Sequence, residues 1–141
     1  MHFEESISYL LAKLATTHKK SLEKVMGRIG LHSGQVFVLF ELWEKDGLRQ
    51  VDLADSLNLS PPTVNKMLTG LIEGDLVTRS RFEDDARSTR IFLTERGRSI
   101  REEVEEQWRS LEETTLADLT ETERLILLTL LKKLTFNYFG R

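Results

Sequence analysis

The sequence contains no cysteine, which excludes disulfide cross-links, thiolate metal ligands and a cysteine redox switch. It also lacks an apolar run near the ~18 to 20 residues that a membrane-spanning helix needs. Its first residues, MHFEE, have neither the basic nor the apolar segment of a secretory signal, so export is not expected. These absences predict a soluble protein without a membrane partner, and they are compatible with a cytoplasmic location.

Patterns typical of catalysis and of metal binding are missing as well. The three histidines show neither the HxxxH nor the HExxH spacing that brings ligands to one face of a helix. No serine lies in a G-x-S-x-G context, and adjacent acids such as Glu102 and Glu103 fit the solvated face of a helix. We therefore expect no metal, no cofactor and no enzyme activity, because no group of catalytic residues converges.

The charges present are unevenly distributed along the 141 residues. The net charge of −3 is unusual for a protein that binds polyanionic nucleic acid. However, seven arginines and four acids lie in residues 77–101, whereas nine acids lie in residues 102–123. An anionic partner is therefore expected to contact the basic middle of the chain.

The clearest pattern lies in residues 51–76 and predicts two short helices joined by a tight turn. Ser60 is placed to cap the second helix, and Pro61 suits its first position, where no donor is missed. Apolar residues then recur at spacings of three and four: Val64, Met67, Leu68 and Leu71. The other side is polar: Thr63, Asn65, Lys66 and Thr69. Short polar side chains suit a DNA major groove ~12 Å wide, so the segment is interpreted as a helix-turn-helix.

A β-hairpin is predicted directly after this motif. Residues 77–82 and 90–93 alternate in polarity, and the polar loop 83–89 separates them. A hairpin in this position makes the motif a winged helix. Leu48 and Arg49 are expected to form a two-residue strand before it, after Gly47 ends the preceding helix in the left-handed conformation.

The remaining segments read as helices, which makes the expected fold mainly α with a small β-hairpin wing. Long amphipathic helices are predicted for residues 3–28 and from residue 94 onward. Ser33 is expected to cap a helix over residues 35–45 that is apolar all round and therefore buried. The last helix, from residue 120 or 121 to about 138, has a wider apolar face than one small core can use. Burial against another subunit is the economical explanation.

Six motifs in this order resemble the multiple-antibiotic-resistance regulator (MarR) family of winged-helix transcription factors. They are LHSGQVFVL (31–39), GLRQVDLA (47–54), LSPPTV (59–64), LVTR (76–79), DARSTRI (85–91) and LTERG (93–97). The resemblance implies one compact unit, with a winged helix-turn-helix at 31–101 and interleaved dimerisation helices at 1–30 and 102–141. It further implies a homodimer that binds a pseudopalindromic double-stranded DNA operator, usually as a repressor, and a pocket for small aromatic or phenolic ligands.

The wing residues carried over from this resemblance are Asp85 and Arg87. In the family the arginine enters the minor groove and the acid orients a basic neighbour. A narrow minor groove concentrates negative potential, which supports this division of roles. Arg79, Arg81 and Arg90 are candidates for phosphate contacts or for pairing with Asp85, and ordinary solvated arginines are the alternative.

On the second helix of the motif, four residues are DNA-binding candidates. Lys66 is its only base, and Asn65 is its only side chain able to bind adenine through two hydrogen bonds. Thr63 is expected to contact phosphate, and a role as the cap alone is the alternative for Ser60.

The same helix departs from the family pattern at two points. Gly70 stands where family members commonly have a second arginine. Gly74 and Asp75 replace a lysine and the helix-ending glycine, so the glycine cap is expected one residue earlier.

Four residues of the first two helices are candidates to line the ligand pocket: Tyr9, His18, His32 and Trp43. They fit the core or the subunit interface equally well, and Phe37 and Phe40 are expected in the core. The absence of cysteine counts against peroxide sensing through a thiol. A winged helix that binds a protein partner instead of DNA is the alternative that the negative net charge supports.

Overall fold

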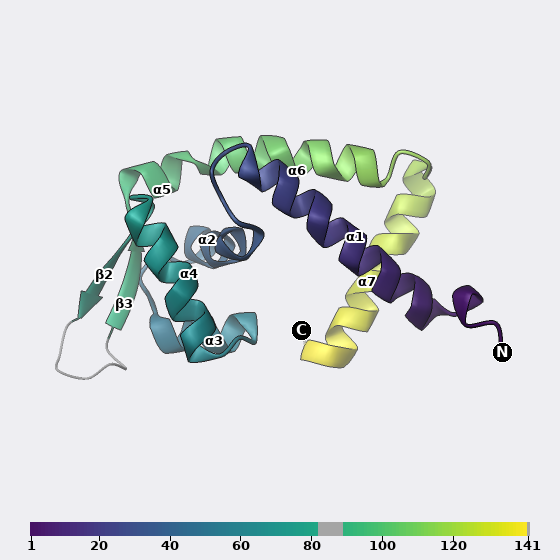
Figure 1. Ribbon diagram of the computed structural model, residues 1–141, viewed down its shortest axis with the longest axis horizontal. Helices are drawn as coiled ribbons and strands as arrows, with labels where there is room; N and C mark the ends of the chain where they lie inside the picture. Colours follow the sequence, from purple (N-terminus) through teal and green to yellow (C-terminus); the bar gives the residue numbers. More distant parts are fainter. Residues whose placement is uncertain (82–88, 141) are drawn as a thin grey trace. The chain divides into compact units, whose positions relative to one another are not determined.

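The computed structural model describes residues 1–81 and 89–140, and it consists of helices and one small sheet (Figure 1). The expected class, mainly α with a β-hairpin wing, is confirmed. The chain divides at Trp108 into two compact units. The elements are η1 (Phe3–Glu5), α1 (Ile7–Gly27), α2 (Ser33–Glu44), β1 (Leu48–Arg49), α3 (Gln50–Leu57), α4 (Pro61–Glu73), β2 (Val77–Arg81), β3 (Thr89–Leu93), α5 (Glu95–Ser99), α6 (Arg101–Thr115) and α7 (Glu121–Phe139).

The predicted helix-turn-helix is present as α3 and α4. Ser60 caps α4, because its Oγ accepts a hydrogen bond from the Thr63 amide at 3.4 Å, and Pro61 occupies the first helical position. Asn58 ends α3 in the left-handed conformation with a φ of 54°, which asparagine adopts more readily than most residues. The apolar side of α4 is buried as predicted, at Val64, Leu68 and Leu71.

The predicted hairpin is formed by β2 and β3, and β1 completes an antiparallel sheet in the order β1-β3-β2. Its register runs from Val77 opposite Leu93 to Arg81 opposite Thr89. The hairpin lies beside α4, which in turn packs against α3 (Figure 1). Residues 82–88, with most of the predicted loop, are outside the described residues.

The start of α2 differs from the prediction. The helix begins at Ser33 itself, so His32 and not Ser33 is the capping residue. Gln35 Oε1 accepts the His32 amide hydrogen at 2.9 Å. The Ser33 amide and hydroxyl both donate to Glu23 on α1, at 3.0 and 2.7 Å. The first amide group of α2 is therefore bound by a carboxylate of α1, and not by the serine hydroxyl as predicted.

Two long helices also have other bounds than the sequence suggested. The 3₁₀ turn η1 occupies the first predicted residues, and α1 starts after Ser6, whose Oγ accepts the Tyr9 amide at 3.2 Å. The helix predicted from residue 94 is divided into α5 and α6 at Ile100. The apolar stripe along these helices is still buried, at Ile100, Val104 and Leu111.

The cap of α4 lies at Gly74, one residue earlier than in the family pattern, as expected. Gly74 has an ordinary φ of −81°, and Asp75 adopts the left-handed conformation with a φ of 57°. Thr94 Oγ1 holds this turn by donating to the Asp75 carbonyl at 2.7 Å. Gly97 packs closely against the residue that follows this turn, because a side chain at position 97 would overlap the Leu76 carbonyl. The segment after the hairpin thus stabilises a left-handed conformation that aspartate adopts more readily than most residues other than glycine.

One side of α2 is exposed, so the prediction that this helix is buried on all sides was wrong. Phe37 is 42% exposed and Phe40 is half-buried, although both were expected in the core. Their rings form an edge-to-face cluster with Trp108, with centroids 5.1 to 6.4 Å apart, and Trp43 adjoins Phe40. Apolar composition predicts that a surface will be covered, but it does not say that the same chain covers it.

The second unit contains α7, whose predicted start is confirmed. The Thr120 amide donates to Glu123 Oε1 at 2.9 Å, and the Glu123 amide donates to Thr120 Oγ1 at 3.2 Å. No residue of α7 is buried. Most of its large apolar side chains are 42% to 78% exposed: Leu125, Ile126, Leu128, Leu130, Leu131, Leu134, Phe136, Tyr138 and Phe139. Neither α7 nor any other helix in the described ranges has the length and hydrophobicity to cross a membrane.

Candidate nucleic-acid interface

The four candidate residues of α4 and its cap are all exposed, on the side opposite the buried stripe. The hydroxyl groups of Ser60 and Thr63 hydrogen-bond to each other at 2.8 Å. Lys66 and Asn65 lie on the next turn of the helix. The amide groups at a helix N-terminus and a lysine one turn later both favour an anion. This end of α4 can therefore approach a phosphate backbone.

The described arginines of the wing lie on two different faces of the sheet. Along β2 the residues alternate, so Arg79 and Arg81 share the face of buried Val77, which is turned toward α3 and α4. Arg90 has the opposite orientation, because its neighbours Thr89 and Ile91 are buried. The sequence interpretation treated the three arginines as equivalent, whereas the sheet places two beside α4 and one on the far face.

Arg90 is tied to the corner that joins α2 to the sheet. Its Nη1 donates to the Gly47 carbonyl at 2.8 Å, and Gly47 has the predicted left-handed φ, here 72°. Arg49, paired with Arg90 across the strands, binds Asp52 through two hydrogen bonds of 2.9 and 3.1 Å. The Arg49 guanidinium holds the pKa of the Asp52 carboxyl below its ordinary value. These contacts give Arg90 a structural role whether or not it also meets DNA.

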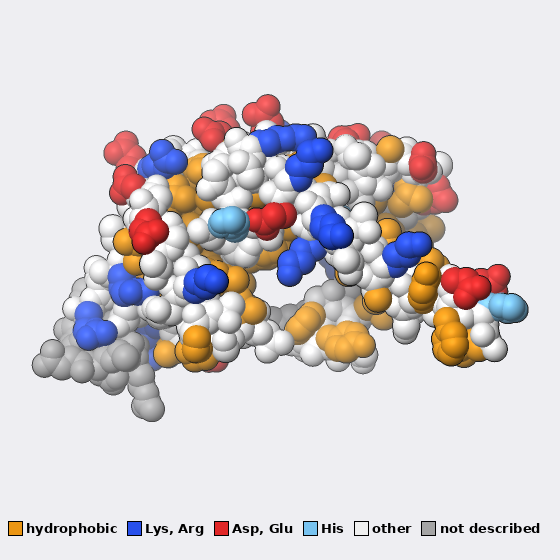
Figure 2. Space-filling model, viewed as in Figure 1, with side chains coloured by type: hydrophobic (Ala, Val, Ile, Leu, Met, Phe, Trp, Pro, Cys, Tyr) orange, Lys and Arg blue, Asp and Glu red, His pale blue; other side chains and the backbone are white. Residues whose placement is uncertain are grey.

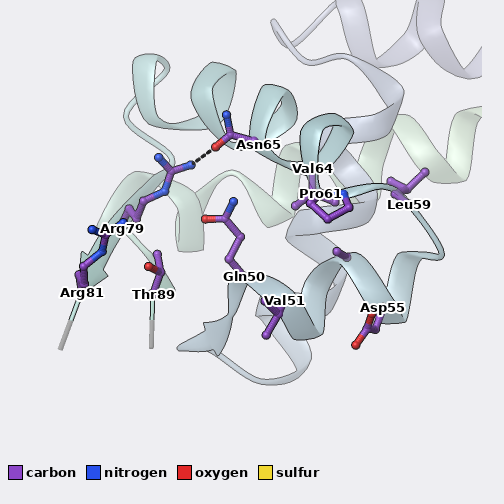
Figure 3. Close-up of a pocket in the computed structure, with 11 residues that line it drawn as sticks. Gln50, Val51, Asp55, Leu59, Pro61, Val64, Asn65, Arg79, Arg81 and Thr89 are labelled. Carbon is purple, nitrogen blue, oxygen red and sulfur yellow. Dashed lines mark hydrogen bonds between the residues drawn. The ribbon is translucent and has the colours of Figure 1, made fainter. Parts of the chain in front are cut away.

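Arg79 contacts Asn65 directly. Its Nη2 donates to Asn65 Oδ1 at 3.1 Å, and the bond joins β2 to the first half of α4 (Figure 3). Both side chains line a cavity of about 370 Å³. The other lining residues come from α3, the turn, α4 and the hairpin: Gln50, Val51, Ala54, Asp55, Leu59, Pro61, Val64, Arg81 and Thr89. The cavity has an apolar floor and a polar rim that carries two arginines.

Gln50 is a lining residue that the sequence interpretation missed. It is the first residue of α3, directly after β1, and Figure 3 shows its amide close to the Arg79–Asn65 pair. A long polar side chain between a strand and a helix was the available signal. Its position beside α4 depends on how β1 pairs with β3, which the local pattern does not specify.

Gly70, the departure from the family pattern, faces α2 and not the outer side of α4. A side chain added there would meet Gln35 Nε2, and one added at Gly34 would meet the end of Met67. Both contacts are with the ends of flexible side chains that can move aside, so helix packing does not require glycine at position 70.

Asp85 and Arg87 are outside the described residues. Their assignment to the wing tip therefore stays a prediction from the resemblance.

The four ligand-pocket candidates are not brought together. Tyr9 and His18 lie on α1, Tyr9 being 43% exposed and His18 half-buried. Trp43 is held in the aromatic cluster, where its Nε1 donates to the Gly97 carbonyl at 2.9 Å. His32 instead contacts Glu23, with 2.7 Å between Nδ1 and Oε1. None of these four side chains lines the cavity between α3, α4 and the hairpin.

Glu23 is the most strongly perturbed acid in the described chain. Hydrogen bonds from the Ser33 amide, the Ser33 hydroxyl and His32 lower the pKa of Glu23 to about 2. The carboxylate thereby satisfies the first amide group of α2. No signal in the local sequence could have identified it, because Glu23 and Ser33 are brought together only by the turn between α1 and α2.

Metal binding is not supported by any cluster in the described residues. Nowhere in residues 1–81 and 89–140 do three or more histidine or acidic side chains converge in a way that could hold an ion. Figure 2 shows basic side chains over α4, the hairpin and α1, and acidic side chains along α6.

A helix-turn-helix followed directly by an antiparallel hairpin defines a winged-helix protein. A model of the MarR family matches residues 31–89, which span α2, the helix-turn-helix and the start of β3. The chain is 29% identical over 104 residues to the organic hydroperoxide resistance transcriptional regulator of Bacillus subtilis, covering 74% of this chain and 71% of the relative. In three other relatives the matched stretch covers 34%, 66% and 55% of their length.

Solved structures extend the similarity to nearly the whole chain. A MarR transcriptional regulator from Methanosarcina mazei has a TM-score of 0.85 at 25% identity, covering 95% of this chain and 96% of that one. Bordetella bronchiseptica BpsR, whose DNA binding is regulated by 6-hydroxynicotinic acid, has a TM-score of 0.83 at 25% identity, covering 95% and 97%. The chain thus resembles the MarR family in sequence over its winged helix-turn-helix, and it shares the fold of solved MarR regulators along nearly its whole length.

Proposed function

We propose that the protein is a sequence-specific DNA-binding transcriptional regulator that works as a homodimer, and that it represses until a small ligand releases it. The observation that carries the proposal is the exposed polar side of α4 flanked by Arg79 and Arg81. This surface combines donors for base edges with positive charge for phosphates. On the family resemblance, Arg87 is assigned to the minor groove and Asp85 to the orientation of a basic neighbour.

The homodimer is supported by the apolar surface that the chain leaves exposed. Apolar side chains of α7 are uncovered along its whole length, and so are Ile7, Leu10, Leu11 and Leu14 on α1. We assign residues 1–30 and 102–141 to dimerisation and residues 31–101 to DNA binding. A two-fold dimer places two copies of α4 in successive major grooves when they lie about 34 to 36 Å apart.

The ligand is proposed to be a small aromatic or phenolic compound, as the similarity to BpsR suggests. Of the four pocket candidates, Trp43 has the strongest support, since it belongs to a partly exposed aromatic cluster. A ligand that changes the separation of the two α4 helices would shift the population away from the DNA-competent dimer. Sensing through a thiol is not part of this proposal, because the chain has no cysteine. The protein is proposed to act in the cytoplasm and to have no catalytic activity.

The direct test is fluorescence anisotropy with the purified protein and DNA from upstream of its own gene. We expect tight binding that weakens steeply between about 50 and 200 mM salt, since each neutralised phosphate releases counterions. Arg87→Ala should weaken binding strongly, while unchanged affinity would remove the wing tip from the interface. If no salt-dependent binding to any DNA is found, the proposed function is wrong and a protein partner becomes the better hypothesis.

A further inference from the structure

The hydrogen bond between Arg79 and Asn65 fixes the orientation of an amide at the centre of the proposed interface. A guanidinium group has only donors, so the atom that faces Arg79 Nη2 at 3.1 Å must be the amide oxygen. The Asn65 NH₂ group then points away from the hairpin, as Figure 3 shows. Among the described residues no acceptor is recorded for this NH₂ group, and Asn65 is exposed.

This orientation changes what Asn65 can recognise. Adenine is bound when an amide oxygen accepts from N6 while the amide nitrogen donates to N7. Guanine presents two acceptors, N7 and O6, and thymine presents O4. Because Arg79 takes one of the two acceptor positions of the Asn65 oxygen and holds that oxygen toward the hairpin, the NH₂ group is the part of the amide that faces outward, and it meets the major groove as a donor. We infer that Asn65 selects a base with an acceptor edge, guanine or thymine, and that Arg79 is a positioning residue for Asn65. This inference rests on the proposed function.

The inference separates Arg79 from Arg81, although both have the same charge and the same face of β2. Arg81 lies two residues closer to the wing tip, opposite Thr89 at the end of the described hairpin. Arg79 lies deeper, opposite Ile91, within reach of α4. An arginine that donates to a side chain of α4 orients that side chain, and it thereby contributes to discrimination between bases. An arginine at a phosphate contributes affinity that is the same for every sequence.

The experiment begins with selection of binding sites from a randomised DNA library by the full-length protein. Affinities are then measured for the selected site and for each single base-pair substitution in one half-site. Asn65→Ala identifies the position that Asn65 reads, because discrimination disappears there. The variants Arg79→Ala and Arg79→Gln are compared at the same position, and Arg81→Ala is the matched control. Gln keeps an N–H donor without the charge, so it distinguishes positioning from charge.

We expect guanine or thymine at the position that depends on Asn65, with about 10-fold discrimination that Arg79→Ala abolishes. Arg79→Gln should retain most of this discrimination, and the dependence of log K on log salt should keep its slope in both variants. Arg81→Ala should leave discrimination intact and lower the slope by about 0.9, as expected for one lost phosphate contact. Thermal unfolding of each variant confirms that the fold is kept.

Two results would overturn the inference while the proposed function stands. One is adenine at the position read by Asn65. The other is an Arg79→Ala variant that weakens binding equally at all sites and lowers the salt slope, since it would then contact phosphate. If the wild-type protein enriches no DNA sequence at all, the proposed function itself has failed.

Discussion

The helices α4 and α7 are both rich in apolar residues, but only α4 has its apolar side covered by its own chain. Along α4, Val64, Leu68 and Leu71 are fully buried and the exposed side is polar. Along α7 no residue is buried, and Leu125 is 66% exposed. The exposed surface of each helix indicates the chemistry of its partner. A polar face with a lysine suits a nucleic acid, whereas an apolar face suits a second copy of the protein.

The largest effect is expected from charges placed on α7. Leu128→Asp combined with Leu131→Asp should convert the dimer into a monomer, because two carboxylates cannot be buried unpaired in an apolar interface. Losing the second half-site should weaken operator binding by at least about 100-fold. Sedimentation velocity and anisotropy measure the two results. Lys133→Asp, an exposed polar position on the same helix, is the control. A double variant that remains dimeric would remove α7 from the interface.

A core substitution in α4 tests the other half of the comparison. Leu68→Ala should lower the free energy of unfolding by about 2 to 5 kcal/mol, because Leu68 is fully buried. This loss should not depend on protein concentration, whereas the loss caused by Leu131→Ala on α7 should, since its burial depends on association. Urea titrations at two protein concentrations measure both. Equal concentration dependence for the two variants would contradict the distinction.

Removing the caps of the two helices should have a smaller effect. Ser60→Ala and Thr120→Ala should each cost about 1 kcal/mol, because each hydroxyl accepts an amide hydrogen at a helix start. The Thr120→Ala substitution should cost more, since Thr120 and Glu123 form two reciprocal hydrogen bonds at that cap. Chemical denaturation measures the two costs, and the conservative variants Ser60→Thr and Thr120→Ser should restore most of the stability. A larger loss of stability in Ser60→Ala than in Thr120→Ala would contradict this ranking.

The sequence predicted those parts of the molecule that depend on neighbours along the chain. The periodicity of α4, its cap at Ser60, the hairpin and the start of α7 at Thr120 are all present as predicted. Each is set by residues within one or two turns of one another. The family motifs extended this to the order of the elements.

Most features that the sequence analysis missed depend on contacts between segments that are separated along the chain. Ser33 does not cap α2, because its hydroxyl donates to Glu23 of α1. Phe37 remains exposed because apolar content does not reveal which chain covers it. The bond between Asn65 and Arg79 requires the packing of β2 against α4, which no local pattern describes. Strand alternation alone would have separated Arg79 from Arg90.

The smallest effect is expected from the acids that support the helix starts, and it depends on pH. Hydrogen bonds at the start of α2 lower the pKa of Glu23 from 4.5 to about 2. A group with a lowered folded-state pKa stabilises the protein above its unfolded pKa and loses this contribution as the pH falls through its folded pKa. Glu23→Gln should therefore lower stability at pH 6 by about 0.5 kcal/mol, a figure reduced because the side chain is 43% exposed.

The difference in stability between wild type and Glu23→Gln should shrink from pH 4.5 downward and vanish near pH 2, as thermal unfolding over this range would show. Glu123 at the start of α7 is the matched comparison. Hydrogen bonds with Thr120 lower the pKa of the Glu123 carboxyl as well, so the deficit of Glu123→Gln should also disappear as the pH falls below 4.5. Because Glu23 links α1 to the helix that packs on α4, its protonation should loosen the support of α4 and leave α7 unaffected. Hydrogen exchange that quickens in α7 but not in α2 and α4 at low pH would contradict this assignment.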